Sequence, residues 1–241
     1  MSEAIGLKIL FLSAEVAPYA KTGGLGDVVG SLPGSAVPIY FIAERNLFDR
    51  PNIYGYHDDP HRFAFFSKAA LELTQALNWR PDIVHGHDWH AAPAITWLST
   101  AGQADSRYGN IPTLFTIHNL AHQGRARWDI FDYLSLLTHR LDQEKYGEVN
   151  FMARGIYHAT LVNTVSPTYA REIMTPEGGA GLDGLLRRRR VDLHGILNGL
   201  DYDVWNPTTD ARLARPFDAY HIDERVHTTR PPSSRRPDRA R

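Results

Sequence analysis

The chain has 241 residues, 43% of them hydrophobic, which is enough to bury the core of one large domain or of two small ones. Its formal net charge of −1 gives no electrostatic reason for binding nucleic acid or a membrane, and neither is expected as a partner. The absence of cysteine excludes disulfides and thiol nucleophiles and suits a reducing compartment. The first apolar run ends at the acidic Glu15, which makes it too short for a membrane span or a secretory signal, so we expect a cytoplasmic protein.

The first part of the chain predicts a strand, a glycine loop and a short helix. Residues 7–14 form an almost continuous apolar run, which is typical of a strand buried on both faces. The loop Lys-Thr-Gly-Gly-Leu-Gly-Asp follows at residues 21–27, and apolar residues at helical spacing then predict a helix that ends at Pro33. The next strand is expected at residues 38–42, after a connection that is barely long enough for a parallel crossover.

Helical and β-rich segments alternate through the middle of the chain. Residues 62–77 and 89–98 have apolar residues at helical spacing, and a brief strand is expected at residues 83–84. Residues 113–117 and 160–165 are further β-rich runs, each followed by a helical segment. This alternation predicts an α/β fold, with a Rossmann-like parallel sheet and helices on both faces.

The end of the chain has a different composition. From Arg225 onward there are six arginines and three prolines, and Val226 is the only aliphatic residue larger than alanine. Such a segment cannot build a core, so we expect it to be disordered.

Five polar clusters each follow a predicted strand. In open α/β sheets, ligands bind beyond the carboxyl ends of the strands, so clusters at these positions predict one functional crevice along a single edge of the sheet. The clusters are residues 21–27, 85–90, 118–119, Ser166 and residues 198–199.

The glycine loop has the features of a phosphate site. Gly23, Gly24 and Gly26 allow backbone N–H groups to approach an anion, the helix that follows offers its positive end, and Lys21 adds a charge. The spacing matches neither the dinucleotide fingerprint nor the P-loop. A tight turn with an ordinary surface lysine is the alternative interpretation.

The segment His-Gly-His-Asp-Trp-His at residues 85–90 permits three interpretations. Closely spaced histidines and a carboxylate could bind Zn²⁺, but the aspartate is one residue earlier than the usual hydrolase pattern requires. The histidines could also be ordinary hydrogen-bonded residues at a strand end. The interpretation that we favour is a carbohydrate subsite, in which Trp89 stacks on a sugar while Asp88 and the imidazoles bind hydroxyl groups.

Two other clusters are weaker signals. His118 and Asn119 close a strand, where they could grip a sugar together with Asp88 or could simply form a turn. Ser166 and Pro167 are expected to begin a helix as N-cap and first residue, and the arginines at residues 187–190 to end one.

Taken together, the motifs resemble the N-terminal domain of bacterial glycogen synthases and plant starch synthases, from about residue 7 to residue 207. They occur in the same order: Lys-Thr-Gly-Gly-Leu-Gly-Asp-Val at residues 21–28, His-Asp-Trp-His at 87–90, Phe-Thr-Ile-His-Asn-Leu at 115–120, Gln-Gly at 123–124, Val-Ser-Pro-Thr-Tyr-Ala at 165–170 and Leu-Asn-Gly-Leu-Asp at 197–201. The expected domains are therefore residues 1–209, with a segment missing near residues 33–38, and a remnant with the tail at residues 210–241.

The resemblance implies a fold, an activity and a set of site residues. The fold would be the N-terminal half of a GT-B glycosyltransferase, which transfers glucose from ADP-glucose to the non-reducing end of an α-1,4-glucan with retention of configuration. No metal or other cofactor is implied. The implied roles are donor-phosphate binding by Lys21, Gly23 and Gly24, loop shaping by Asp27, catalysis by His118 and Asp88, and sugar or acceptor binding by His87, Trp89, His90 and Asn119.

The sequence departs from the family in two places. The family has several tens of residues, including a strand, where this chain passes directly from Leu32 to Pro38, and it continues into a second domain after the Asn198 motif. We therefore expect the chain to be inactive alone, or to act with a separately encoded C-terminal domain. A non-catalytic glucan-binding or regulatory fragment and a His/Asp metal hydrolase are the alternative functions.

Overall fold

The computed structural model describes residues 6–31, 37–136, 140–145, 147–199 and 205–227. The chain divides into two compact units, residues 1–198 and 199–241. In the second unit the described residues form turns and one 3₁₀ helix, η2 (Ile222–His227). Most of the predicted missing segment, residues 32–36, and most of the arginine-rich tail, residues 228–241, lie outside the described residues.

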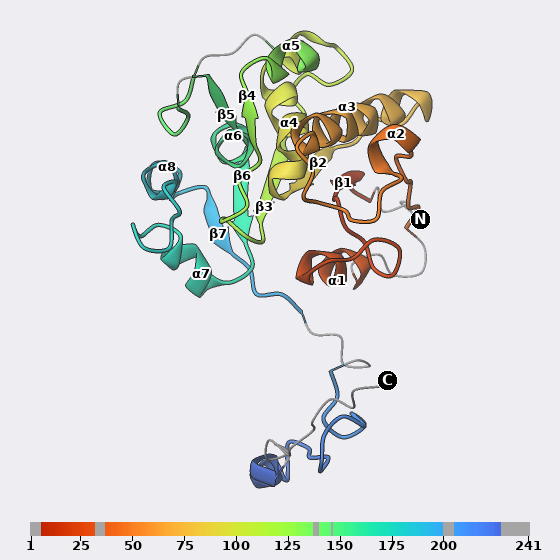
Figure 1. Ribbon diagram of the computed structural model, residues 1–241, viewed down its shortest axis with the longest axis vertical. Helices are drawn as coiled ribbons and strands as arrows, with labels where there is room; N and C mark the ends of the chain where they lie inside the picture. Colours follow the sequence, from red (N-terminus) through yellow and green to blue (C-terminus); the bar gives the residue numbers. More distant parts are fainter. Residues whose placement is uncertain (1–5, 32–36, 137–139, 146, 200–204, 228–241) are drawn as a thin grey trace, which may run out of the picture. The chain divides into compact units, whose positions relative to one another are not determined.

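The first unit is built on a five-stranded parallel sheet, which confirms the predicted α/β class (Figure 1). The strands lie in the order β1-β2-β3-β6-β7, which is also their order along the chain. Their bounds are β1 (Ile9–Leu12), β2 (Ile83–His87), β3 (Thr113–Ile117), β6 (Leu161–Thr164) and β7 (Leu193–Gly195). A separate antiparallel pair consists of β4 (Arg125–Arg127) and β5 (Glu148–Asn150).

The other helices are α1 (Gly24–Ser31), α2 (Arg45–Phe48), α3 (Asp59–Ala76), α4 (Asp88–Ser99), η1 (Ala101–Ala104), α5 (Ile130–Leu134), α6 (Phe151–His158), α7 (Pro167–Glu172) and α8 (Asp183–Arg188). Of these, α1, α3, α4, α7 and α8 fall close to segments that the sequence predicts, whereas α2, η1 and α6 were not predicted. None of the helices in the described part of the chain has the length and apolar character needed to cross a membrane.

One face of the sheet carries α4 and α6. A Cβ at Gly86 of β2 would lie 3.2 Å from Ile95 of α4, and a Cβ at Gly155 of α6 would lie 2.4 Å from the Phe115 ring. Gly86 and Phe115 are register partners, so their side positions face the same way. A Cβ at Gly155 would collide with the ring, and one at Gly86 would make a tight contact, so both helices lie close against the sheet.

The opposite face is more open than the sequence predicts. Ile9 and Leu161 point to that face and are 47% and 43% exposed. Each strand of the sheet lies beside the previous one on the same side, from β1 to β7. Right-handed connections between strands in this order place their helices on one face of the sheet. Helices reach the other face when the chain also adds a strand on the other side of β1, as in a doubly wound sheet. In the described residues, α4 and α6 cover one face, and the opposite face is exposed at Ile9 and Leu161.

The strand predicted at residues 38–42 does not form. This segment is irregular and has no strand partner, and Phe41 instead contacts Tyr19 through an edge-to-face ring pair with centroids 5.2 Å apart. A strand needs hydrogen-bond partners as well as β-forming residues, and among the described residues this segment pairs with no strand; β1, at the edge of the sheet, pairs only with β2.

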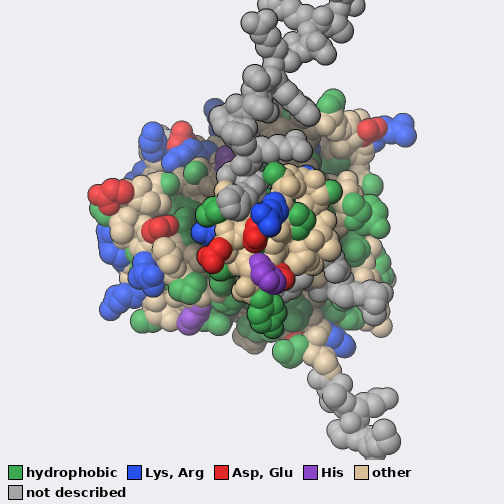
Figure 2. Space-filling view, turned by 90° about the horizontal axis from the view of Figure 1, so that it is seen from below, with side chains coloured by type: hydrophobic (Ala, Val, Ile, Leu, Met, Phe, Trp, Pro, Cys, Tyr) green, Lys and Arg blue, Asp and Glu red, His purple; other side chains and the backbone are tan. Residues whose placement is uncertain are grey.

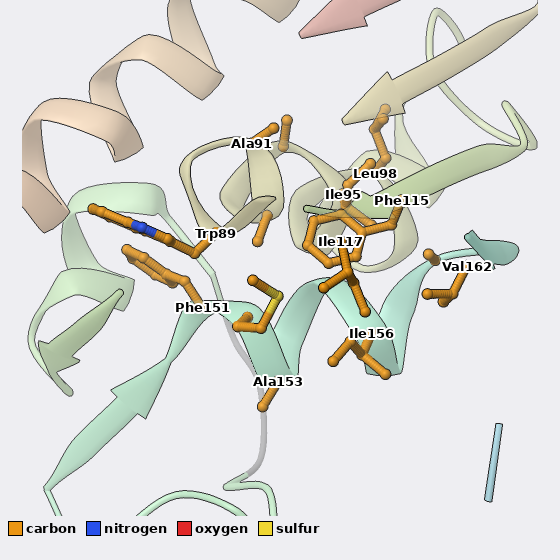
Figure 3. Packing of buried hydrophobic residues seen from close by; sticks show 14 of the residues in the cluster. Trp89, Ala91, Ile95, Leu98, Phe115, Ile117, Phe151, Ala153, Ile156 and Val162 are labelled. Carbon is orange, nitrogen blue, oxygen red and sulfur yellow. The ribbon is translucent and has the colours of Figure 1, made fainter. Parts of the chain in front are cut away.

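The hydrophobic core lies between the sheet and α4 and α6 (Figure 3). Phe115 and Ile117 of β3 meet Ile95 of α4 and Ile156 of α6, and all four side chains are fully buried. At the end of this core nearest the predicted site, the Trp89 ring lies along the ring of Phe151.

Two predicted helix caps can be compared with the structure. Ser166 is the N-cap of α7 as expected, because its Oγ accepts a hydrogen bond of 2.9 Å from the Tyr169 N–H. As expected, α8 ends at the arginines: Arg187 and Arg188 lie in its last turn, and the C-cap residue is Arg189. Its guanidinium donates to four carbonyl groups at the carboxyl end of α6, those of Ile156, Tyr157, Ala159 and Thr160.

Candidate functional site

The carboxyl ends of β1, β2 and β3 bring three of the predicted clusters to one edge of the sheet. In the space-filling view, acidic and basic side chains are interspersed over the visible surface, in keeping with the net charge of −1 (Figure 2). Ser166 is used as a helix cap, and the pair Asn198 and Gly199 is divided between the two units. The candidate site therefore consists of the glycine loop, the end of β2 and the end of β3.

Lys21 is half exposed and is already paired within its own loop. Its Nζ lies 2.6 Å from Oδ1 of Asp27, a residue in the first turn of α1. Both side chains are open to solvent, so the pair is weak and a stronger anion can displace the carboxylate. This contact is compatible with the loop-shaping role predicted for Asp27, which stays a prediction.

Glu15 is a residue of this site that the sequence reasoning missed. Its side chain is 5% exposed, and its Oε2 accepts hydrogen bonds from the N–H groups of Thr22 and Gly23 at 2.8 and 2.9 Å. Its Oε1 accepts a hydrogen bond from the Tyr54 hydroxyl at 2.8 Å. Residues 16–20 separate Glu15 from the loop, and no local pattern in the sequence indicates which amides its carboxylate reaches.

The glycines of the loop therefore differ in what their amides can bind. The Gly23 N–H, predicted to face a phosphate, is bonded to Glu15. Among the described residues, no acceptor is present for the N–H groups of Gly24 and Leu25, which begin α1. Gly26 permits the tight loop, because a Cβ there would lie 3.2 Å from Oε2 of Glu15 and 3.0 Å from Cγ of Lys21.

Asp88 is buried at the junction of β2 and α4. Its backbone is left-handed, with φ of 53°, and its Oδ1 accepts hydrogen bonds from the N–H groups of His118 at 2.8 Å and Asn119 at 3.4 Å. Burial raises the pKa of the Asp88 carboxyl to about 7, against the lowering effect of these two bonds. Asp88 thus ties the end of β2 to the end of β3, and the two predicted catalytic residues are in direct contact.

His118 is half buried and contacts His87. His118 Nε2 lies 2.9 Å from His87 Nδ1, so one ring donates and the other accepts. His87 is 2% exposed, which leaves no surface for the sugar contact that the resemblance implies for it. Asn119 is exposed, and its Oδ1 accepts a hydrogen bond from the Ala121 N–H, as in a turn.

Trp89 and His90 do not fit their predicted roles at a sugar-binding surface. Trp89 is 8% exposed, and Phe63, Phe151 and Gly124 pack closely against its indole. His90 is buried as well, with its ring stacked on that of Tyr54 at 4.7 Å. Both residues belong to the first turn of α4, which directs them into the core and leaves no free ring face for a sugar.

The histidines of this region are held in the neutral form. Burial lowers the pKa of His85 and of His118 to about 4 and that of His90 to about 3, and it lowers the pKa of His87 well below its usual value. At neutral pH these rings are uncharged hydrogen-bonding groups. Within the described residues, no three His, Asp or Glu side chains converge in the way that metal ligands do.

A small cavity of about 40 Å³ lies away from this edge, between α3 and α4, where Leu71 and Trp97 line it. Its lining includes none of the predicted site residues. Fold and site together define a Rossmann-like α/β domain with its ligand face at the carboxyl edge of a parallel sheet.

Comparison with known proteins assigns the family. The model of the family described as starch synthase catalytic domain matches residues 8–37 and 34–188, and the chain belongs to this family. The chain is 40% identical to the glycogen synthase of Moorella thermoacetica over 91% of this chain and 56% of that protein. It is 37% identical to glycogen synthase 1 of Geobacter metallireducens over 88% of this chain and 55% of that protein.

A solved structure agrees with this assignment. The catalytic domain of starch synthase IV from Arabidopsis thaliana, bound to ADP and acarbose, matches with a TM-score of 0.73 and 30% identity, over 90% of this chain and 56% of that one. The chain thus spans about half the length of the relatives it matches. The alignment with the Moorella protein extends over 271 positions, more than the 241 residues of this chain, so the relative contains segments without a counterpart here.

Proposed function

We propose that this chain carries the acceptor-side half of a glycogen or starch synthase active site, for transfer of glucose from ADP-glucose to an α-1,4-glucan with retention of configuration. The observation that supports this most strongly is the convergence of the Lys21 loop with Asp88 and His118 at adjacent strand ends. An anion-binding loop beside buried polar groups suits a ligand with a diphosphate at one end and a sugar at the other.

The residues divide between the two ends of this ligand. Lys21 and the free amides that begin α1 would bind the donor phosphates, where a lysine and helix N–H groups stabilise negative charge. His118 and Asn119 would contact the sugar, and Asp88 would hold the His118 segment in place through its backbone bond.

In this proposal the chemistry depends on electrostatic stabilisation. The leaving phosphate would assist the incoming hydroxyl on one face of the sugar, so the reaction needs no carboxylate pair from this chain. No metal or other cofactor is part of the proposal. The cysteine-free composition supports a cytoplasmic location.

Titration calorimetry of the purified chain tests both ends of the site. We expect Lys21→Ala to weaken ADP binding about tenfold or more, because it removes a charge-assisted contact. His118→Ala should weaken binding of maltohexaose and leave ADP binding unchanged. Lys68→Ala, at an exposed position on α3, is the control for loss of a lysine.

An elongation assay with ADP-glucose and maltohexaose separates catalysis from simple glucan binding. Binding of both ligands without elongation would support a glucan-binding role for the chain alone, and elongation after addition of a donor-side domain would support a divided enzyme. A chain that binds neither ADP nor maltohexaose would contradict the proposal.

A further inference from the structure

The buried carboxylate of Glu15 connects three segments that are distant in the sequence. It follows β1, accepts two hydrogen bonds from the glycine loop, and accepts a third from Tyr54 in the segment before α3. Tyr54 in turn stacks on His90 of α4, with ring centroids 4.7 Å apart. The Glu15 side chain therefore fixes the position of the glycine loop relative to the core.

The contacts of Glu15 are those of an internal anion. Backbone N–H groups that converge on one oxygen form the type of concavity that binds phosphate, and a carboxylate fills it here. In the described part of the chain Glu15 has no lysine or arginine partner, so the two amides and the tyrosine hydroxyl carry its stabilisation. The Thr22 and Gly23 amides are consequently not available to a ligand while Glu15 holds them.

We propose that Glu15 is a positioning residue, which holds the glycine loop by its Thr22 and Gly23 amides and leaves donor-phosphate binding to Lys21 and to the Gly24 and Leu25 amides. The inference rests on the proposed function for its ligand, and its structural half is independent of that function. The phosphate contact that the sequence predicts for Gly23 is then made by the amides of Gly24 and Leu25.

Two substitutions separate hydrogen bonding from charge. Glu15→Gln keeps an oxygen that accepts both loop amides, and its amide group donates to the Tyr54 oxygen in place of the present bond. Glu15→Ala removes every contact. Glu44→Ala is the matched control, because Glu44 is a partly buried carboxylate away from the loop that also accepts a backbone N–H, from Leu47 at the start of α2.

The first measurement is amide exchange and chemical shift by NMR, without ligand. In Glu15→Ala we expect exchange at Thr22 and Gly23 to be at least tenfold faster than in the parent chain, whereas Glu44→Ala leaves both amides unchanged. In Glu15→Gln the two amide protons should move upfield, because a neutral acceptor forms a weaker bond. Unchanged amide signals in both Glu15 variants would overturn the inference.

The second measurement is ADP binding by calorimetry. We expect at least a tenfold loss in Glu15→Ala, and unchanged or tighter binding in Glu15→Gln, since removal of a nearby negative charge favours a diphosphate. Equal ADP affinity in Glu15→Ala and the parent chain would contradict the positioning role. If the parent chain itself binds no ADP, the proposed function fails, and the amide signals still decide whether Glu15 holds the loop. Where Glu15→Ala does not fold, Glu15→Gln and its amide shifts provide the test.

Discussion

Two regions of the first unit bury carboxylates in different ways. Beside β5, Glu144 forms a fully buried pair with Arg154, with contacts of 2.7 and 2.8 Å, and it also accepts the N–H groups of Leu141 and Asn150. At the strand ends, Glu15 and Asp88 are buried and bonded to N–H and O–H donors, and within the described residues neither has an ion-pair partner.

The difference indicates a structural role for the Glu144–Arg154 region and a functional role for the strand-end region. A buried ion pair with all its hydrogen bonds satisfied holds a segment in one place, here the residues before β5 against α6. Burial raises the pKa of the Asp88 carboxyl, which keeps hydrogen-bonding capacity beside neutral histidines. The strand-end region is therefore the less stable electrostatically, as is common at functional sites.

Acid is expected to destabilise the strand-end region, and this loss of stability should be the largest of the predicted effects. The pKa values of four histidines, His85, His87, His90 and His118, are lower in the folded state than the usual 6.5, so the unfolded chain binds more protons as the pH falls. Their contribution to stability is present above pH 6.5 and is lost as the pH falls towards 4, by about 1.4 kcal/mol per pH unit for each histidine.

Urea unfolding at a series of pH values measures this loss. His90→Phe, which suits the aromatic contacts of His90 with Tyr54 and Phe63, should reduce the slope by about one proton. A substitution at the exposed His194 serves as the control. A flat profile from pH 7 to pH 4.5 would show that these rings are not held neutral by burial.

Breaking the paired region should have the next largest effect. Arg154→Ala leaves Glu144 buried without its partner, and we expect the free energy of unfolding to fall by about 3–5 kcal/mol. The double variant Arg154→Met with Glu144→Leu should recover part of this loss, because it leaves no buried charge. Chemical denaturation measures all three proteins. A cost below about 1 kcal/mol for Arg154→Ala would remove the contrast between the two regions.

Asp88→Asn should increase the free energy of unfolding, which is the opposite of the effect expected for Arg154→Ala. The folded-state pKa of Asp88 is raised from 3.8 to about 7, so its contribution to stability is fully present below pH 3.8 and is lost as the pH rises through 7. The amide keeps the shape and removes the charge, so we expect the variant to be more stable at pH 8 by about 2–4 kcal/mol.

Asp88→Ala is the matched comparison for the backbone. Asparagine adopts the left-handed conformation that φ of 53° requires, whereas alanine does so at a cost of about 1 kcal/mol. Alanine also leaves the His118 N–H without its acceptor. Thermal unfolding at pH 8 should therefore place the alanine variant below the asparagine variant, and the reverse order would contradict the geometry assigned to Asp88.

The smallest effect on stability is expected at the exposed ion pair of Arg125 and Glu148. Arg125 of β4 lies 3.5 Å from Glu148 of β5, and both side chains are more than 40% exposed. Solvent screens such pairs, so Arg125→Ala should change the free energy of unfolding by less than about 1 kcal/mol. A loss as large as that of Arg154→Ala would mean that burial does not explain the difference between the two pairs.

Much of the site was predictable because local motifs carry it. The positions of the glycine loop, Asp88 and His118 at strand ends follow from apolar runs that end in polar residues, and these strands form where expected. The role of Glu15 was not predictable in this way. Its partners are Thr22, Gly23 and Tyr54, and no pattern in the sequence indicates which buried oxygen will reach which amide.

The sequence by itself determined the parallel α/β class, most strands of the main sheet and the family, because these depend on periodicity and on short motifs. Only the tertiary structure decided that Trp89, His87 and His90 are buried, that α4 and α6 pack on one face of the sheet, and that Gly23 is held by Glu15. The physical reason is that burial and hydrogen-bond partners depend on how distant segments pack together, and residue types along one segment do not specify that packing.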